Sequence, residues 1–270
     1  MNDSDLEQQA RNAVAEAIGY HTVAIDFSRA AKEKDKGWGT GSFVRIGGKY
    51  FIVTCKHVVK PEYKSEDLRY LYKGGESFRW VDKEVITKGS LSQIERIIDK
   101  KFPSEIPILN RIYSDDLDDF VLLEIGPCAG EIGSNKFLEI KSNDVRGPEA
   151  NTLVYFMGFS TELTRVVTKK GELGLFIFYG VSSIIDKEIN ASDFDPKRHF
   201  LIDFGPTETG DTIDPHGLSG CGVWARSPSG KDRLWTPNIY LIGIQHGYFR
   251  RSRVLKATNI NQLIRLATNG

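Results

Sequence analysis

The segment Trp38-Gly-Thr-Gly-Ser-Phe-Val-Arg-Ile-Gly-Gly-Lys-Tyr-Phe-Ile-Val-Thr-Cys-Lys-His57 contains two β-rich runs that meet at a pair of glycines. β-Branched and aromatic residues dominate both runs. Gly47 and Gly48, between them, supply the positive φ angles that a tight turn between antiparallel strands needs. The segment therefore predicts a β-hairpin, with His57 placed where its second strand ends.

A second informative segment is Asp118-Asp-Phe-Val-Leu-Leu-Glu-Ile125, an apolar strand with acidic residues on its N-terminal side. Asp115 and Asp116 lie close by, so four carboxylates compete for a role beside a histidine. Asp119 is favoured because it directly abuts the apolar run, where the start of a strand can bury its carboxylate. Alternation along the strand predicts that Asp118 points the other way, to solvent.

The third segment is Asp214-Pro-His-Gly-Leu-Ser-Gly-Cys-Gly-Val-Trp224, with Ser219 at its centre. Its glycines allow a tight turn and a close approach of the backbone to a bound group. Such a turn can present the Ser219 hydroxyl outward while the amides of Gly217 and Ser219 point into one small space, which is how main chain forms an oxyanion hole. Cys221 is a rival nucleophile, because a thiolate beside a histidine is more reactive than a hydroxyl.

Together these segments resemble the trypsin-like (chymotrypsin-fold) serine peptidases. Four separated pieces occur in the order that the family has them, and they cover most of the chain. The ordered set is far more specific than any one piece. The pieces are Gly39-Thr-Gly-Ser-Phe43 with Tyr50-Phe-Ile-Val-Thr-Cys-Lys-His-Val58, Asp119-Phe-Val-Leu-Leu123, Val154-Tyr-Phe-Met-Gly-Phe-Ser160, which looks like the strand that opens the second barrel, and Gly217-Leu-Ser-Gly220.

The resemblance implies an all-β fold of two antiparallel β-barrels with the active site at their interface. It implies that His57 is the general base, that Asp119 orients it and that Ser219 is the nucleophile. Gly217 and Ser219 then supply the oxyanion hole. The implied reaction is hydrolysis of peptide bonds through an acyl-enzyme, with no cofactor and no metal.

Several positions depart from the family's pattern or bear on specificity. Leu218 replaces the Asp with which many secreted relatives bind a freshly cut N-terminus, so activation by clipping is not expected. Cys221 puts a side chain where the family has a glycine. By position, Ile213 forms the base of the specificity pocket, which argues against a preference for Lys or Arg, but Asp211 and Asp214 flank it and a one-residue slip would reverse this interpretation. Gln245 and His246 lie on the strand expected to line that pocket, and alternation lets one of them face it.

The N-terminal half of the chain is expected to hold two parts. Residues 1–36 form an amphipathic helix, over 4–18, and a lead-in. Residues 37–140 form the first barrel. An inserted segment at about 60–113 interrupts this barrel and contains a helix over 90–102, ahead of a proline.

Residues 141–270 are expected to form the second barrel and a C-terminal helix. The helix covers 258–267, with Thr258 or Asn259 as its cap. A polar connection over 127–148 leads into this barrel. Its strands are expected at 152–157, 173–181, 199–204, 222–225 and 239–244.

Composition limits the partners and the compartment. The 270 residues carry 36 Lys and Arg against 36 Asp and Glu, so the formal net charge is zero, and neither nucleic acid nor a membrane is an expected partner. Three cysteines, an odd number, suit free thiols in a reducing compartment and the intracellular or bacterial members of the family. No apolar run approaches the roughly 18 residues of a membrane span. A cytoplasmic location is expected.

Three classes of function fit these observations. The leading one is an intracellular serine endopeptidase that acts on protein or peptide substrates, with gating by a regulatory protein partner as a further hypothesis. The alternative is a catalytically inactive binding module that kept the fold. The third is a cysteine-type or esterase variant of the same scaffold.

Overall fold

The computed structural model describes residues 3–27, 38–64, 68–72, 106, 108–126, 132–141, 147–159, 177–205, 214–226 and 238–269. The helices are α1 (Asp3–Tyr20), α5 (Ile260–Asn269) and the short 3₁₀ helix η4 (Ser134–Lys136). The strands are β1 (Thr22–Asp26), β2 (Trp38–Ile46), β3 (Lys49–Cys55), β4 (Arg69–Tyr72), β5 (Ile108–Tyr113), β6 (Phe120–Ile125), β7 (Leu138–Ile140), β8 (Leu153–Phe159), β9 (Ile177–Ile185), β10 (His199–Asp203), β11 (Gly222–Arg226), β12 (Ile239–Phe249) and β13 (Val254–Asn259).

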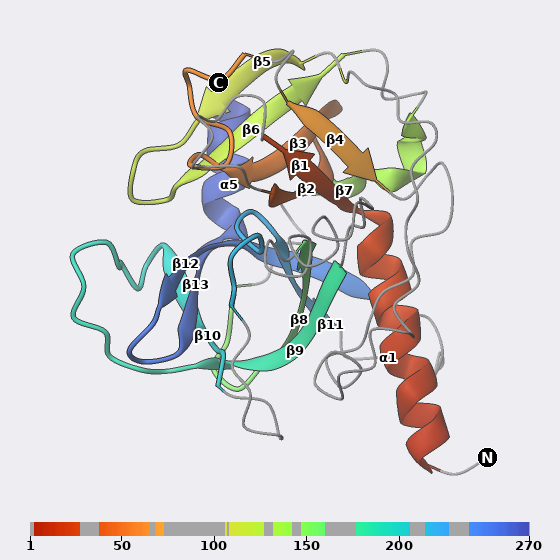
Figure 1. The fold of residues 1–270 in the computed structure, drawn as a ribbon, viewed down its shortest axis with the longest axis vertical. Coiled ribbons are helices and arrows are strands. Elements are labelled where there is room, and N and C mark those ends of the chain that lie inside the picture. Colours follow the sequence, from red (N-terminus) through yellow and green to blue (C-terminus); the bar gives the residue numbers. More distant parts are fainter. Residues whose placement is uncertain are drawn as a thin grey trace, which may run out of the picture.

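These strands form two β units, which lie one above the other in Figure 1. The first is a seven-stranded sheet in the order β4-β1-β2-β3-β6-β5, with β7 paired to β2. The second is a closed barrel in the order β10-β13-β12-β11-β8-β9. The all-β class is confirmed, whereas only one of the two expected barrels closes within the described residues. Closing the first sheet would require its end strands β4 and β5 to pair, and most of the chain between them lies outside the described ranges.

The predicted hairpin at the start of the first sheet is confirmed. Strands β2 and β3 pair antiparallel from Ile46↔Lys49 onward. Gly47 and Gly48 have φ angles of 57° and 82°, the left-handed values of a two-residue turn that matches the twist of the strands. Strand β3 then ends two residues before His57.

The N-terminal region contains a helix and, in addition, a strand. Helix α1 confirms the amphipathic pattern, and it buries Val14, Ala15 and Ile18. Strand β1 pairs with both β2 and β4. Because β1 lies inside residues 1–36, the first sheet begins earlier in the chain than the sequence pattern indicates. Its continuous burial gives no alternation by which to recognise it.

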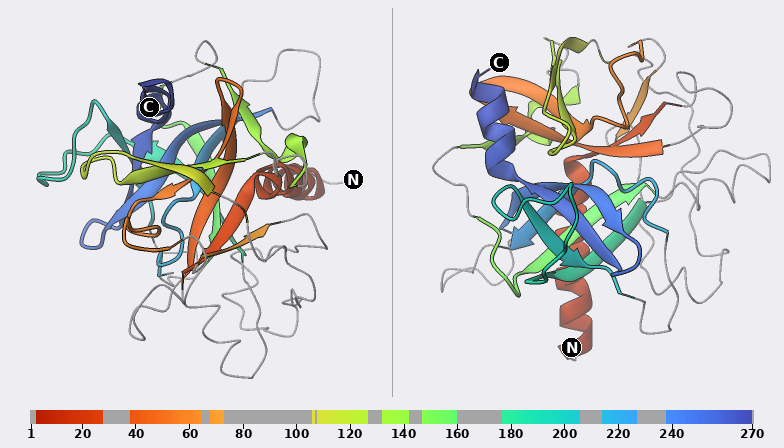
Figure 2. Two further views of the ribbon diagram at one scale, coloured as in Figure 1. Left: turned by 90° about the horizontal axis from the view of Figure 1, so that it is seen from above. Right: turned by 90° about the vertical axis from the view of Figure 1, so that its left-hand side faces the viewer.

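The core lies inside each β unit and between them. Strand β3 shows how one strand serves two parts of it: Ile52 packs inside the first sheet, whereas Phe51 and Val53 face the neighbouring unit and its buried Trp224. Residues of α1 and α5 join the same central cluster, and Figure 2 shows these helices on different sides of the molecule. The two units are therefore packed as one body.

The C-terminal part contains the predicted elements with shifted bounds and one addition: β9 covers 177–185 instead of 173–181, β12 runs on to 249, and α5 covers 260–269 instead of 258–267. Strand β13, which the sequence pattern does not indicate, pairs with β10 and β12 and completes the barrel. Helix α5 follows it directly, and Asn259 Oδ1 accepts a hydrogen bond from the Asn261 amide at 3.0 Å. Asn259 is therefore the cap, because Thr258 uses its hydroxyl elsewhere.

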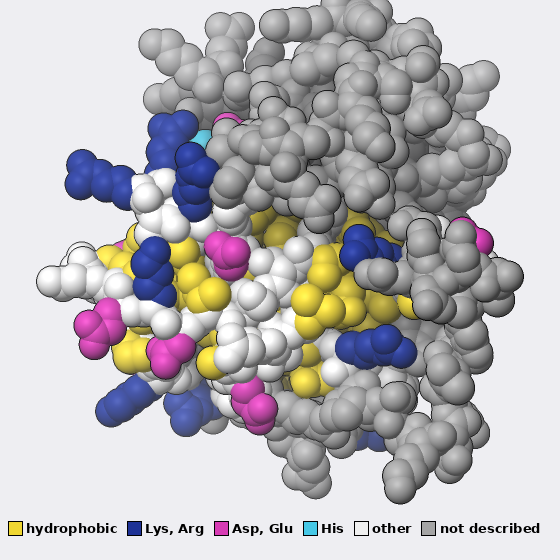
Figure 3. All heavy atoms as spheres, turned by 90° about the horizontal axis from the view of Figure 1, so that it is seen from below, with side chains coloured by type: hydrophobic (Ala, Val, Ile, Leu, Met, Phe, Trp, Pro, Cys, Tyr) yellow, Lys and Arg dark blue, Asp and Glu magenta, His cyan; other side chains and the backbone are white. Residues whose placement is uncertain are grey.

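Two further expectations concern the remaining segments. The helix predicted over 90–102 lies outside the described residues. The connection predicted over 127–148 lies partly within them and contributes β7 to the first sheet. None of the helices in the described ranges is long and apolar enough to cross a membrane. The face drawn in Figure 3 carries both acidic and basic side chains, in keeping with the zero net charge.

Candidate active site

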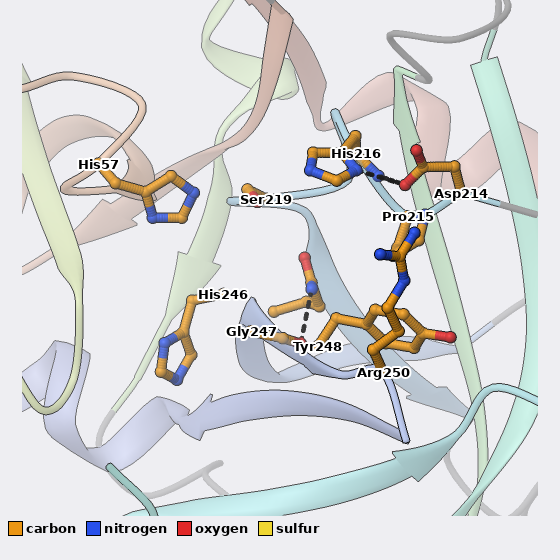
Figure 4. A pocket seen from close by; sticks show the side chains of 10 residues that line it. His57, Asp214, Pro215, His216, Ser219, His246, Gly247, Tyr248 and Arg250 are labelled. Carbon is orange, nitrogen blue, oxygen red and sulfur yellow. Dashed lines mark hydrogen bonds and ion pairs between the residues drawn. The ribbon is translucent and has the colours of Figure 1, made fainter. Parts of the chain in front are cut away.

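The three side chains of the expected triad come from turns at the ends of strands. His57 follows β3, Asp119 precedes β6, and Ser219 lies in the turn before β11. His57 and Ser219 line one pocket of about 630 Å³ (Figure 4). The pocket lies where the first sheet meets the closed barrel, and its other lining residues are Asp214, Pro215, His216, Gln245, His246, Gly247, Tyr248 and Arg250.

His57 and Asp119 form a close pair. The Nδ1 of His57 lies 2.6 Å from Asp119 Oδ2, and the His57 amide lies 3.3 Å from Asp119 Oδ1. An ionised carboxylate only accepts hydrogen bonds, so Nδ1 must carry the proton of this contact. The neutral ring is then left with an unprotonated Nε2, the state that a general base requires. Figure 4 shows one ring nitrogen of His57 turned toward Ser219.

Asp119 has a strained backbone. Its φ angle is 50°, a left-handed value that costs a non-glycine residue of order 1–3 kcal/mol. Hydrogen bonds hold it: its amide donates to Asp115 O at 3.2 Å, and the Lys56 amide donates to its carbonyl at 3.0 Å. Strain held in place at a titratable residue is typical of functional sites.

The prediction that Asp118 points to solvent is wrong. Its side chain is only 5% exposed and is paired with Arg198. Strand β6 begins at Phe120, so Asp118 and Asp119 belong to the preceding turn, where strand alternation does not apply. Asp119 is nevertheless the carboxylate that contacts His57.

The turn that carries Ser219 is fixed by backbone contacts to both β units. Gly217 and Gly220 have φ angles of 95° and 91°. The Ser219 carbonyl accepts from the Thr40 amide at 2.9 Å, and the Gly220 amide donates to Gln245 O at 2.8 Å. The Thr40 hydroxyl donates to Gly217 O at 2.7 Å. Nothing in the sequence around Thr40 signals this role, because the contact joins residues 177 positions apart.

Two amides of this turn are left to bind a ligand. Within the described residues, the amides of Gly217 and Ser219 donate no hydrogen bond. The Ser219 side chain likewise has no hydrogen bond to any described residue, His57 included. Ser219 lines the pocket, and the buried Gly217 lies two residues before it. Unpaired donors and an unpaired hydroxyl in such a turn are suited to a substrate carbonyl, and catalytic contacts are often long before substrate binds.

The structure also decides where Cys221 lies. Its side chain is fully buried among apolar residues inside the closed barrel. Burial raises the pKa of its thiol, which therefore stays protonated. Cys221 does not line the pocket, so its thiol is not placed to act as the nucleophile there.

Cys55, His57 and Asp119 offer donor atoms within 4.8 Å of one another, which raises the question of a metal site. Burial raises the pKa of the Cys55 thiol well above its ordinary value, and its Sγ donates to Gln245 O at 3.3 Å. His57 Nδ1 and Asp119 Oδ2 lie 2.6 Å apart, which is the distance of a direct hydrogen bond. Two atoms that bind one zinc ion lie farther from each other, because each is about 2 Å from the ion. The contacts suit proton transfer better than metal binding.

Of the three residues expected at the specificity pocket, two lie in the described part of the chain. Ile213 lies outside the described residues. Gln245 and His246 both line the pocket, although alternation allows only one of them to do so. The pairing of β12 with β13 shifts register between Gln245 and Gly247, and such a bulge interrupts alternation.

His246 has a contact that the sequence does not reveal. Its Nε2 lies 2.9 Å from Thr258 Oγ1, whose own proton goes to the carbonyl of Asp118. Nε2 is therefore the donor, and Nδ1, 4.0 Å from Asp119 Oδ2, is unprotonated. Burial, reinforced by nearby cationic groups, lowers the pKa of His246 well below its ordinary value. A neutral ring thus lies behind Asp119 and leaves His57 as its hydrogen-bonded partner.

We expect Gly220→Ala to destabilise the protein more than Gly47→Ala. A Cβ at Gly220 would lie 2.0 Å from Thr40 O and 2.3 Å from Thr54 Oγ1, whereas a Cβ at Gly47 would meet open space. Both positions have positive φ, so alanine at Gly47 measures the backbone strain alone, about 1–2 kcal/mol. Overpacking should add about 1–3 kcal/mol at Gly220. Urea unfolding measures both losses, and equal values would show that the turn has room to relax.

Comparisons with known proteins bear on the fold. No protein-family model and no curated protein matches the chain. The active form of the Rv3671c protease from M. tuberculosis matches with a TM-score of 0.53 and 14% identity, over 96% of this chain and 84% of that one. A structure from a study of coupled folding and binding by the Sesbania mosaic virus VPg protein matches with a TM-score of 0.49 and 12% identity, over 91% and 88%. The chain therefore shares its fold with a protease of known structure.

Proposed function

We propose that this protein is a trypsin-like serine endopeptidase that hydrolyses peptide bonds through an acyl-enzyme at Ser219. The observation that carries the proposal is the pairing of His57 with Asp119 at 2.6 Å beside the pocket that Ser219 also lines. The unpaired amides of Gly217 and Ser219 add the donors that such chemistry needs. The fold shared with a protease agrees with it.

The proposed reaction follows from these positions. Nε2 of His57 removes the Ser219 proton as Oγ attacks the carbonyl carbon of the substrate, and the carbonyl oxygen becomes an anion held by the Gly217 and Ser219 amides. His57 then passes the proton to the leaving amine as the C–N bond breaks, which leaves an ester on Ser219. Water, activated by the same base, hydrolyses the ester. Positioned proton transfer contributes about 10²–10⁴ in rate, and each oxyanion donor about 10²–10³.

We also propose a cytoplasmic location. Cys55 and Cys221 are free, buried thiols, and thiols persist in reducing compartments. Fractionation of cells that produce the untagged protein tests this, and recovery with the secreted or membrane fraction would argue against it.

A fluorophosphonate probe tests the proposed chemistry directly. We expect the native protein to gain the mass of one adduct on the tryptic peptide that contains Ser219, because only an activated hydroxyl attacks the probe. Heat-denatured protein and a His57→Ala variant should stay unlabelled. Folded protein that takes up no label would favour the inactive binding module instead. Iodoacetamide should leave labelling unchanged, because Cys221 is buried and protonated.

A further inference from the structure

Asp118, the residue before Asp119, forms an ion pair in which its carboxylate is buried and the Arg198 guanidinium is partly exposed. Asp118 is 4% exposed, and both of its carboxylate oxygens accept hydrogen bonds from Arg198, with Nε to Oδ1 at 3.0 Å and Nη2 to Oδ2. The same Nη2 donates to Asp115 Oδ2 at 2.6 Å. One guanidinium therefore holds two carboxylates of the turn that ends at Asp119.

This contact joins the two β units. Asp118 belongs to the first sheet, since it precedes β6, whereas Arg198 directly precedes β10 of the closed barrel. The Arg198 carbonyl accepts from the Asn259 amide at 2.8 Å, which fixes the arginine to the end of β13. From the same strand, Thr258 Oγ1 donates to Asp118 O at 3.0 Å. The turn is thus fastened to the barrel at a side chain and at a backbone carbonyl.

The fastening matters because the parts of the site come from different units. His57 and Asp119 lie in turns that flank strands of the first sheet, and Ser219 lies in a turn of the closed barrel. The hydrogen bonds from Asp119 to Asp115 and Lys56 stay within the first sheet. They hold the shape of the turn but do not relate it to the barrel. Arg198 supplies that relation at a side chain and Thr258 at a backbone carbonyl, both at Asp118, the residue before the carboxylate that contacts His57.

Arginine suits this position chemically. Its planar guanidinium can bond two oxygens of one carboxylate and reach a second carboxylate, whereas a lysine ammonium is a compact point charge. Hydrogen bonding to Asp118 raises the pKa of Arg198 above its ordinary value, despite the opposing effect of desolvation. The positive charge of Arg198 is therefore permanent. A second basic side chain, His199, has its Nε2 3.5 Å from Asp118 Oδ1.

We propose that Arg198 is a positioning residue which, through Asp118 and Asp115, holds Asp119 where it can orient His57. The inference rests on the proposed peptidase function and adds a condition to it. Asp119 is then aligned with His57 only when the closed barrel is packed against the first sheet. If the barrel loosens, the two side chains lose their alignment, and the protein becomes inactive and does not cleave proteins unselectively.

The test is a double variant, Asp118→Leu with Arg198→Met. Removing one partner alone leaves a buried charge unpaired and threatens the fold, whereas apolar replacement of both partners of a buried ion pair is often tolerated. We expect a folded protein whose kcat for peptide hydrolysis falls by about 10²-fold with KM little changed, the effect of misplacing catalytic groups by about 1 Å. A second readout is the strongly downfield proton resonance of the His57–Asp119 hydrogen bond, which should be lost.

The outcomes separate the inference from the proposed function. An active wild type with a folded double variant that keeps both kcat and the resonance overturns the inference. A wild-type protein without peptidase activity contradicts the proposed function. The resonance then still tests whether Arg198 aligns Asp119 with His57. If the double variant does not fold, Arg198→Lys serves in its place and should weaken the resonance, since lysine cannot bridge both carboxylates. Arg45→Met is the matched control, because it removes a half-exposed ion pair with Glu139 and should leave kcat and the resonance unchanged.

Discussion

Ser219→Ala is expected to lower kcat for peptide hydrolysis by about 10⁶-fold, the size of effect seen when the nucleophile of a serine protease triad is removed. Alanine lacks the oxygen that forms the acyl-enzyme, so His57 and Asp119 have no proton to transfer. The Gly217 amide and the Ser219 backbone remain, which should leave a small residual rate above that of water. Steady-state kinetics on a peptide substrate, with the variant purified away from any wild-type enzyme, gives the measurement.

The fold should survive this change, because the Ser219 hydroxyl bonds no described residue and the turn is held by its backbone. Ser182→Ala is the matched control. It removes another hydroxyl of the closed barrel, which donates to Asp203 O at 2.6 Å away from the pocket, and should leave kcat unchanged. Turnover that persists in Ser219→Ala and disappears in Cys221→Ala would instead identify a cysteine-type enzyme.

The features that could be predicted from sequence are those set by near neighbours in the chain. A pair of glycines between two β-rich runs fixes the hairpin of β2 and β3, because few other residues adopt the φ angles of that turn. The glycines around Ser219 likewise fix the shape of its turn. An acid at the start of an apolar run places Asp119 just before the first residue of β6, which is paired with the last residue of β3.

The features that could not be predicted depend on contacts between distant residues. Asp118 can be buried because it pairs with Arg198, 80 positions later in the chain, and nothing in the sequence near either residue indicates this pair. His246 and Gln245 both reach the pocket because of a bulge that depends on the partner strand. Strand β1 is buried along its whole length, so its sequence has no alternation to reveal it. Each of these three features depends on tertiary packing, which the local sequence pattern does not reveal.

Asp119→Asn is expected to lower kcat by about 10⁴-fold while the fold stays intact, as in triads where the acid becomes an amide. The Asn amide group can donate to Nδ1 of His57, which favours the ring with its proton on Nε2. In that tautomer Nε2 has no free lone pair with which to accept the Ser219 proton. The backbone should tolerate the change, since Asn adopts left-handed φ angles more readily than most residues and Asp119 has a φ of 50°. Kinetics and urea unfolding of the same preparation separate the two effects.

Asp116→Asn provides the matched control for this variant. Asp116 lies in the same turn and carries the same charge, but its side chain is 93% exposed and pairs with Lys56 instead of His57. An exposed pair of this kind contributes at most about 1 kcal/mol to stability. We therefore expect Asp116→Asn to retain nearly full kcat. If both variants lost turnover alike, the negative charge of the turn as a whole, and not the hydrogen bond from His57 to Asp119, would be what the base requires.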